Sequence, residues 1–152
     1  EDWLADVGYG AAVMSAPLRI VDRAPQATHN GMFRITPVGR DLKLEIQSTR
    51  RWIPMVLITP QAQLDFDFIA PNWYTSTHPK SLFRNRLIAC RATAAERYGL
   101  LGNRLTIRRP DGGAQEIELD RDRLEATLSD VFSIEVTDEL RAAIERVVWS
   151  VG

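Results

Sequence analysis

The feature that most constrains the fold of this sequence is a pair of segments in which apolar and polar residues alternate. Residues 32–35 and 42–46 both have this period of two, and they flank residues 38–41. Alternation places the apolar side chains on one face of a β-strand, and a short turn between two such strands makes a hairpin. A third strand is expected at residues 52–58, where Pro54 cannot donate a ladder hydrogen bond and so indicates an edge strand or a bulge. The first third of the chain is therefore expected to be antiparallel β-structure.

The pattern changes at Thr59 and Pro60, because a hydroxyl residue before a proline is typical of a helix start. A kinked or two-part helix is expected over residues 61–77, with Pro71 at the start of its second part. Four short strands and two helices are expected after it, the strands at residues 87–92, 98–101, 104–108 and 115–119, and the helices at residues 121–128 and after a cap at Thr137.

These elements predict an α+β fold in three parts. Residues 1–60 would be the remainder of an antiparallel β-barrel or β-sheet domain, residues 61–86 an inter-domain helical linker, and residues 87–152 a small antiparallel sheet with carboxy-terminal helices. The chain does not begin with methionine, and residues 3–7 are typical of a strand with no preceding turn or cap. We therefore expect the chain to be a piece of a longer protein.

Composition excludes several classes of partner. The formal net charge is -1, from 19 Lys and Arg against 20 Asp and Glu, so the chain has no net positive charge that would attract nucleic acid or an anionic membrane. No run approaches the roughly 20 apolar residues that span a bilayer. The single cysteine, Cys90, suits a reducing compartment, and the cytoplasm is expected. We expect Cys90 to be a small buried apolar residue, and no metal site, because two distant histidines and one cysteine lack ligand spacing.

Asp6 is the residue that most needs a chemical explanation. It shares a face with Leu4 in an otherwise apolar strand and lies just before the glycine turn at residues 8–10. An unpaired buried carboxylate is costly, so Asp6 should accept hydrogen bonds from an amide, an arginine or an imidazole. Two readings stay open at this point: a cap of the glycine turn, or a functional carboxylate beside a main chain that a ligand can approach.

Two segments carry a resemblance to a known family. Residues 4–10, Leu-Ala-Asp-Val-Gly-Tyr-Gly, resemble the Asp-Val-Gly-Phe-Gly segment of arylamine N-acetyltransferases. Residues 71–83 resemble a longer and more specific segment of that family, Asn-Trp-Tyr-x-Ser-Thr-x-Pro-x-Ser-x-Phe. Shorter matches occur in order at residues 16–18, 33–35, 52–55 and 100–107, the last resembling the family's carboxy-terminal lid.

The resemblance implies part of a cysteine-protease-like transferase fold that acts by a ping-pong mechanism with a Cys-His-Asp triad. The donor would be acetyl-coenzyme A (acetyl-CoA), and the acceptor an arylamine, arylhydroxylamine or arylhydrazine. Asp6 matches the triad aspartate, whereas the family's cysteine and histidine precede it in sequence. The upstream portion of the same protein would therefore supply both, and neither Cys90 nor the two histidines match those positions.

The resemblance also assigns binding residues. Tyr9, where the family usually has phenylalanine, and Phe83 would line the acceptor pocket, although ordinary core packing is an alternative for Phe83. CoA would contact the following residues: Gly8, Tyr9, Gly10, Asn103, Arg108 and Arg109. A solvated pair of arginines is the alternative for the last two. Three further alternatives stay open: an amide synthase of the same fold, a non-catalytic binding module, and assembly as a homo-oligomer.

Overall fold

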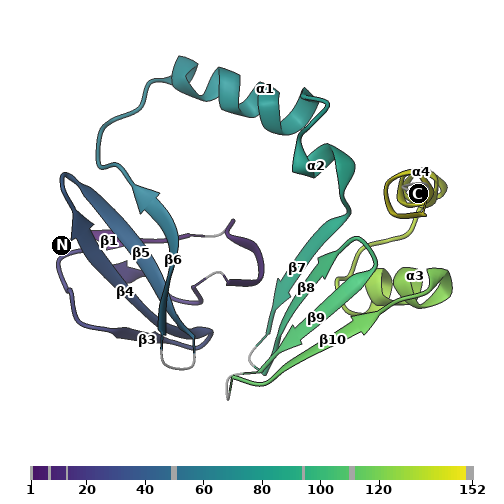
Figure 1. The fold of residues 1–152 in the computed structure, drawn as a ribbon, viewed down its shortest axis with the longest axis horizontal. Helices are drawn as coiled ribbons and strands as arrows, with labels where there is room; N and C mark the ends of the chain where they lie inside the picture. The colour runs from purple at the N-terminus through teal and green to yellow at the C-terminus, as the bar shows by residue number, and fades with distance from the viewer. Residues whose placement is uncertain are drawn as a thin grey trace. The chain divides into compact units, whose positions relative to one another are not determined.

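The computed structural model describes residues 2–6, 8–12, 14–48, 51–93, 95–109 and 112–149 (Figure 1). They fall into two compact units. The first comprises Glu1–Ala62, Ala92–Arg97 and Arg108–Gly113, and the second comprises Gln63–Arg91, Tyr98–Ile107 and Ala114–Gly152. Among the described residues, no helix is both long and apolar enough to cross a membrane.

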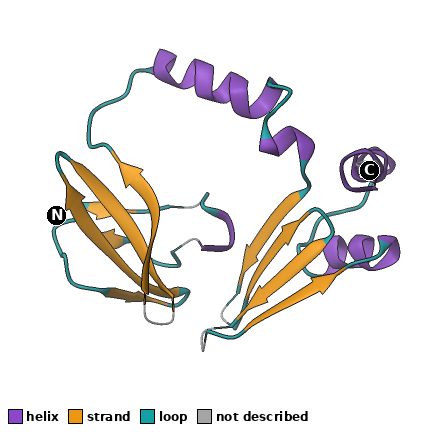
Figure 2. Ribbon diagram, in the orientation of Figure 1, coloured by secondary structure: helices purple, strands orange, loops and turns teal. Residues whose placement is uncertain are grey.

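A four-stranded antiparallel sheet dominates the first unit (Figure 2). Its strands run in the order β3 (Gln26–Thr28), β4 (Gly31–Val38), β5 (Asp41–Ser48) and β6 (Arg51–Ile58). The predicted hairpin is confirmed: Val38 pairs with Asp41, and Gly39 has a φ of 63° in the turn between them, a conformation that glycine adopts without strain. Strand β3 was not predicted, because Gln26-Ala27-Thr28 has no apolar alternation.

Strand β6 contains the irregularity that Pro54 predicts. Glu45 of β5 pairs with Pro54, but the neighbouring Leu44 pairs with Val56, so Met55 has no partner across the ladder. This extra residue is a β-bulge. Strand β6 is also the last strand in the order of its sheet, so both readings of Pro54 are confirmed.

The core of the first unit lies on one face of this sheet. Phe33, Ile35 and Leu44 are buried there with two residues from outside the sheet, Met14 and Leu18. Leu18 belongs to β2 (Leu18–Arg19), which pairs with β1 (Trp3–Leu4). The strand expected at residues 3–7 is thus shorter than predicted, and Val7 lies outside the described residues.

The other face of the sheet holds a buried carboxylate. Glu45 is 4% exposed and accepts hydrogen bonds from Arg34 Nε at 2.7 Å and Thr36 Oγ1 at 3.1 Å, with Lys43 Nζ at 3.1 Å. The hydrogen bond from Arg34 lowers the pKa of Glu45, burial opposes that change, and Lys43 and Thr36 add to the lowering. The Arg34 guanidinium also lies over the Trp52 ring, 4.3 Å from its centroid.

The helical segment begins later than predicted. A 3-10 turn, η2 (Asp65–Phe68), leads directly into α1 (Ile69–Thr77), so the two-part helix is confirmed but starts at residue 65 rather than 61. The cause is local: the Leu64 amide donates to Asp67 Oδ2 at 2.9 Å, which fixes the chain where the turn begins. Pro71 lies in the first turn of α1, where its missing N–H costs no hydrogen bond.

A short second helix, α2 (Leu82–Asn85), follows α1 and was not predicted. Ser81 between them is 1% exposed and its hydroxyl donates to the Thr75 carbonyl at 2.7 Å. No residue within η2, α1 or α2 is buried. The segment exposes many large apolar side chains: Leu64, Phe66, Phe68, Ile69, Trp73, Tyr74, Leu82 and Phe83.

The second sheet has the predicted antiparallel strands in the order β10 (Ala114–Glu118), β9 (Arg104–Arg108), β8 (Arg97–Leu101) and β7 (Ile88–Ala92). Leu100 and Leu105 of this sheet pack with Leu124 and Leu128 of α3 (Arg121–Asp130) and with Ile144 of α4 (Asp138–Ile144). The predicted Thr137 cap is confirmed by the hydrogen bond from the Leu140 amide to Thr137 Oγ1 at 3.3 Å. A five-residue π-helical turn, Glu145–Trp149, continues α4. The predicted α+β class with antiparallel sheets is therefore correct.

The Glu45 network predicts how stability depends on pH. Because folding lowers the pKa of Glu45, the carboxylate stabilises the fold above the unfolded pKa of about 4.3, and this contribution is lost as pH falls through the lower folded pKa. Glu45→Gln should lose about 1–3 kcal/mol near neutral pH and show a flatter dependence on pH. Urea unfolding from about pH 7 down to about pH 3 measures both. Glu116→Gln, on an exposed position of β10, is the control, and identical pH profiles for wild type and Glu45→Gln would contradict the prediction.

Candidate functional site

Asp6 lies two residues beyond β1, at a point fixed by the pairing of that strand. Trp3 pairs with Arg19 and Leu4 with Leu18, and Leu18 is buried in the core. The Gly8 amide donates to Asp6 Oδ1 at 2.8 Å, which is a turn closed by an aspartate side chain. Asp6 therefore caps the glycine turn, which is one of the two readings considered for it.

The second carboxylate oxygen of Asp6 is left for other chemistry. Among the described residues, Asp6 Oδ2 has no hydrogen bond, and the side chain is half-buried. An ionised carboxylate is an acceptor only, with room for about four hydrogen bonds, so Oδ2 can still accept from an imidazole N–H. The two readings of Asp6 are therefore compatible, since each uses a different oxygen.

Tyr9 joins the Asp6 turn to the sheet of the same unit. Its hydroxyl donates to the Met55 carbonyl at 2.7 Å, and Met55 is the bulged residue of β6 that has no partner across the ladder. Tyr9 is 42% exposed. The hydroxyl that distinguishes this tyrosine from the phenylalanine of the resembling segment thus has a structural partner, while part of the ring stays available to a ligand. Gly10 follows with a φ of 70°, which a non-glycine residue would adopt only with strain.

Phe83 and Asn103 belong to the second unit. Phe83 lies in α2 and is 67% exposed, so core packing, the alternative considered for it, is wrong in the described chain. Asn103 lies in the β8–β9 turn, and its side-chain amide donates to the Leu119 carbonyl at 3.2 Å. Asn103 therefore ties the hairpin to the end of β10, whatever else it contacts.

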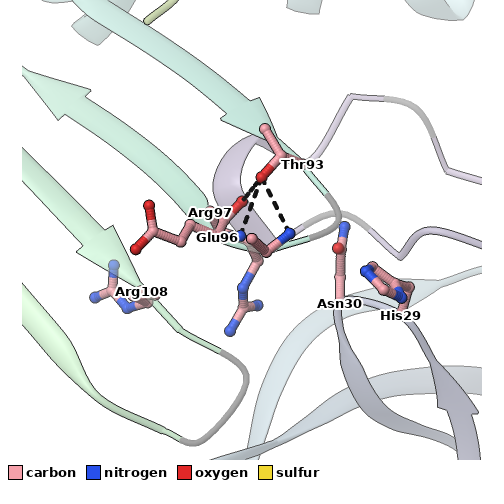
Figure 3. A pocket seen from close by; sticks show the side chains of 7 residues that line it. His29, Asn30, Thr93, Glu96, Arg97 and Arg108 are labelled. Carbon is pink, nitrogen blue, oxygen red and sulfur yellow. Dashed lines mark hydrogen bonds between the residues drawn. The ribbon is translucent and has the colours of Figure 1, made fainter.

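The two arginines expected to contact CoA differ in their surroundings. Arg109 Nε donates to Glu96 Oε1 at 3.0 Å in an ion pair. Arg108 instead lines a small pocket that also includes Arg97 (Figure 3). The sequence analysis did not identify Arg97. The predicted hairpin could have indicated it, because two strands joined by a two-residue turn place residues 97 and 108 opposite each other.

The expectation that Cys90 is a buried apolar residue was wrong. Cys90 lies on β7 and is exposed, not buried. In a five-residue strand the side chains alternate between faces, and the neighbouring Ala89 takes the position that faces the core. Across the described parts of the chain, no group of three or more His, Cys, Asp or Glu side chains is arranged to hold a metal ion.

Comparisons with known proteins agree on one family. A family model described as N-acetyltransferase matches residues 1–141. The chain is 32% identical over 118 residues to the arylamine N-acetyltransferase of Mycolicibacterium smegmatis, covering 78% of this chain and 42% of that one. It is 33% identical over 137 residues to the enzyme of the same name from Mycobacterium tuberculosis strain H37Rv, covering 90% of this chain and 48% of that one.

Solved structures give the same result. The structure of Mycobacterium marinum arylamine N-acetyltransferase in complex with CoA matches with a TM-score of 0.87 at 30% identity, covering 95% of this chain and 55% of that chain. The chain is also 31% identical over 108 residues to an N-malonyltransferase of Fusarium pseudograminearum, covering 64% of this chain and 31% of that one. The chain spans about half the length of the curated arylamine N-acetyltransferases that it matches over most of its own length.

The Tyr9 hydrogen bond can be tested by removing one oxygen. Tyr9→Phe should speed amide hydrogen exchange at Gly8 and Gly10 and lower the free energy of unfolding by about 0.5–1.5 kcal/mol, because the turn loses its link to β6. Exchange followed residue by residue with NMR measures the first effect, and urea unfolding measures the second.

Tyr74→Phe is the matched control, because the Tyr74 ring stacks on His78 with centroids 4.6 Å apart and its hydroxyl has no hydrogen bond among the described residues. Exchange rates at Gly8 and Gly10 that are equal in Tyr9→Phe and wild type would show that the hydroxyl does not hold the turn.

Proposed function

Because the chain belongs to the arylamine N-acetyltransferase family, we propose that its complete protein transfers acetyl from acetyl-CoA to the nitrogen of arylamines, arylhydroxylamines and arylhydrazines. The match over residues 1–141 supports this proposal, and the free oxygen of Asp6 is the observation that carries it. The chain spans about half the length of its curated relatives. We therefore propose that it supplies the triad aspartate and part of the donor and acceptor sites.

In the proposed mechanism Asp6 acts on a histidine. Asp6 Oδ2 accepts the imidazole N–H, which fixes the tautomer and stabilises the imidazolium. The imidazolium in turn lowers the pKa of a nearby cysteine thiol, so that a thiolate forms near neutral pH. The histidine and the cysteine come, in this proposal, from protein outside these 152 residues.

Acetyl transfer then takes two steps of the ping-pong type. The cysteine thiolate attacks the thioester carbonyl of acetyl-CoA, an S–C bond forms to the enzyme, and the CoA thiolate leaves and takes the imidazolium proton, so that the imidazole becomes neutral. The acceptor nitrogen next attacks the acetyl-cysteine, the new N–C bond replaces the S–C bond, and the imidazole takes the proton of the amine. A free thiolate survives best in a reducing compartment, and we place the enzyme in the cytoplasm.

The acceptor and donor contacts follow from the exposed parts of the chain. Tyr9 and Phe83 are 42% and 67% exposed. We propose that their rings pack against the aromatic acceptor, with about 0.5–1.5 kcal/mol per ring pair beyond burial. We propose that CoA contacts the following residues: Gly8, Tyr9, Gly10, Asn103, Arg108 and Arg109. Asn103 and Arg109 already bond within the chain, so only their remaining N–H groups are available.

A different acyl donor is the second candidate, because the chain is also similar to an N-malonyltransferase. Malonyl-CoA differs from acetyl-CoA by one carboxylate, which an unpaired cation near the acyl group would recognise. Assaying both donors with one aromatic amine separates the two candidates.

The chain by itself should transfer no acetyl group. A thioester intermediate needs a thiolate activated by a base, and Cys90 is exposed on β7 at a position that does not match the family's nucleophile. Arylamine acetylation and acetyl-CoA hydrolysis by the isolated 152-residue chain should equal the background rate. Turnover that Cys90→Ala abolishes would make Cys90 the nucleophile and overturn the proposed role of the chain.

In the complete protein, Asp6→Asn should keep the turn but remove most of the activity. Asparagine retains the oxygen that accepts from Gly8, yet it cannot offset an imidazolium charge, so acetyl transfer should fall by orders of magnitude. The corresponding change in a serine protease costs about 10⁴ in rate. The rate of alkylation of the active-site cysteine by iodoacetamide across pH measures the thiolate directly and should fall near neutral pH.

Asp22→Asn is a matched control, because Asp22 Oδ1 accepts from the Ala24 amide at 3.0 Å in a turn of the same kind. If Asp6→Asn behaves as Asp22→Asn does, with an unchanged alkylation profile and near-normal turnover, Asp6 is only a turn cap.

A further inference from the structure

A small pocket in the first unit gathers positive charge. Its lining includes Arg97, Arg108, Glu96, Thr93, His29 and Asn30, all within the first unit (Figure 3). The Thr93 hydroxyl already bonds within the chain, because it donates to the Glu96 carbonyl at 3.0 Å and accepts from the Glu96 amide at 3.0 Å. These two hydrogen bonds fix the turn that leads into Arg97.

Arg97 and Arg108 lie opposite each other in neighbouring strands. Arg97 is the first residue of β8 and Arg108 the last of β9, and the turn at residues 102–103 joins these strands. Like charges directly opposite in an antiparallel pair destabilise it. Partial burial and the charge of Arg108 lower the pKa of Arg97, so the two guanidinium groups repel each other where water screens them incompletely.

No described carboxylate forms an ion pair with either arginine. Neither Arg97 nor Arg108 has an ion pair or hydrogen bond to another described side chain. The carboxylate of the pocket, Glu96, is engaged by Arg109 at 3.0 Å. Two guanidinium groups therefore stay unneutralised in one hollow, an arrangement that an anion would stabilise.

We propose that Arg97 and Arg108 bind a phosphoryl group in this pocket. Guanidinium groups are planar forks that match phosphate oxygens in bidentate hydrogen bonds, and two of them balance a doubly charged phosphate. The phosphoryl group can belong to CoA or to free phosphate. If the phosphoryl group belongs to CoA, the proposal rests on the function proposed above, and Arg97 then contacts the acetyl donor together with Arg108.

Calorimetric titration of the 152-residue chain tests this inference without any measurement of acetyl transfer. The probes are CoA, dephospho-CoA, pantetheine and inorganic phosphate, in a buffer free of phosphate and sulfate. Arg97→Gln and Arg108→Gln should each raise the Kd for CoA by about tenfold or more. Arg123→Gln changes the net charge equally at an exposed position on α3 and should leave the Kd unchanged.

Two further readouts separate binding from folding and identify the source of the phosphate. Without ligand, Arg97→Gln should unfold at the wild-type temperature or above it, since a repulsion is removed, and Arg97→Lys should bind more weakly because the fork is lost. Weaker binding of dephospho-CoA than of CoA assigns the site to the 3′-phosphate, and equal binding assigns it to the diphosphate.

Arginine-dependent binding of inorganic phosphate alone supports the site and assigns it to a free anion. Pantetheine that binds the double variant Arg97→Gln, Arg108→Gln as it binds wild type supports phosphate recognition. CoA and inorganic phosphate that bind the double variant as tightly as the wild type, or that do not bind the wild type, overturn the inference.

Discussion

The hydrogen bond from the Gly8 amide to Asp6 Oδ1 is the contact on which the candidate site depends. It satisfies one oxygen of the carboxylate within the chain and leaves the other oriented by a closed turn. The turn is held on two sides, by the pairing of β1 with β2 and by the Tyr9 hydroxyl on the Met55 carbonyl. A carboxylate with one committed oxygen is positioned without being neutralised, and the proposed triad chemistry requires both properties.

Charged side chains have ion-pair partners in some parts of the described chain and lack them in another. Glu45 is almost fully buried, and three donors surround it. Arg141 binds Glu125 through two nitrogens, at 2.9 and 3.0 Å, and so ties α4 to α3. Arg97 and Arg108 differ from these satisfied groups, because no described side chain forms an ion pair with either guanidinium group, and like charges opposite each other destabilise an antiparallel pair.

Sequence patterns predicted the elements in which local and tertiary preferences agree. The β4–β5 hairpin, the bulge at β6 and the Thr137 cap were predictable because alternation, proline and hydroxyl residues each impose one local geometry. Strand β3 was not, because its strand conformation comes from pairing with β4. The helix start moved to Asp65 because the Asp67 side chain overrode the Thr59-Pro60 signal.

For the site, the residues of the Asp6 turn could be named from the sequence, but their hydrogen bonds could not. Oδ1 bonds locally, whereas the Tyr9 hydroxyl reaches a bulged carbonyl 46 residues away, which no local pattern encodes. The burial of Cys90 was misjudged because the register of β7 decides which of its side chains face the core.

The most direct test of the role of Asp6 is a crystal structure of the complete protein. We expect an imidazole nitrogen within about 2.6–3.2 Å of Asp6 Oδ2, while the Gly8 amide keeps its hydrogen bond to Oδ1 at 2.8 Å. An Asp6 Oδ2 that faces solvent, or that pairs with a lysine or arginine while the active-site histidine lies elsewhere, would contradict the account.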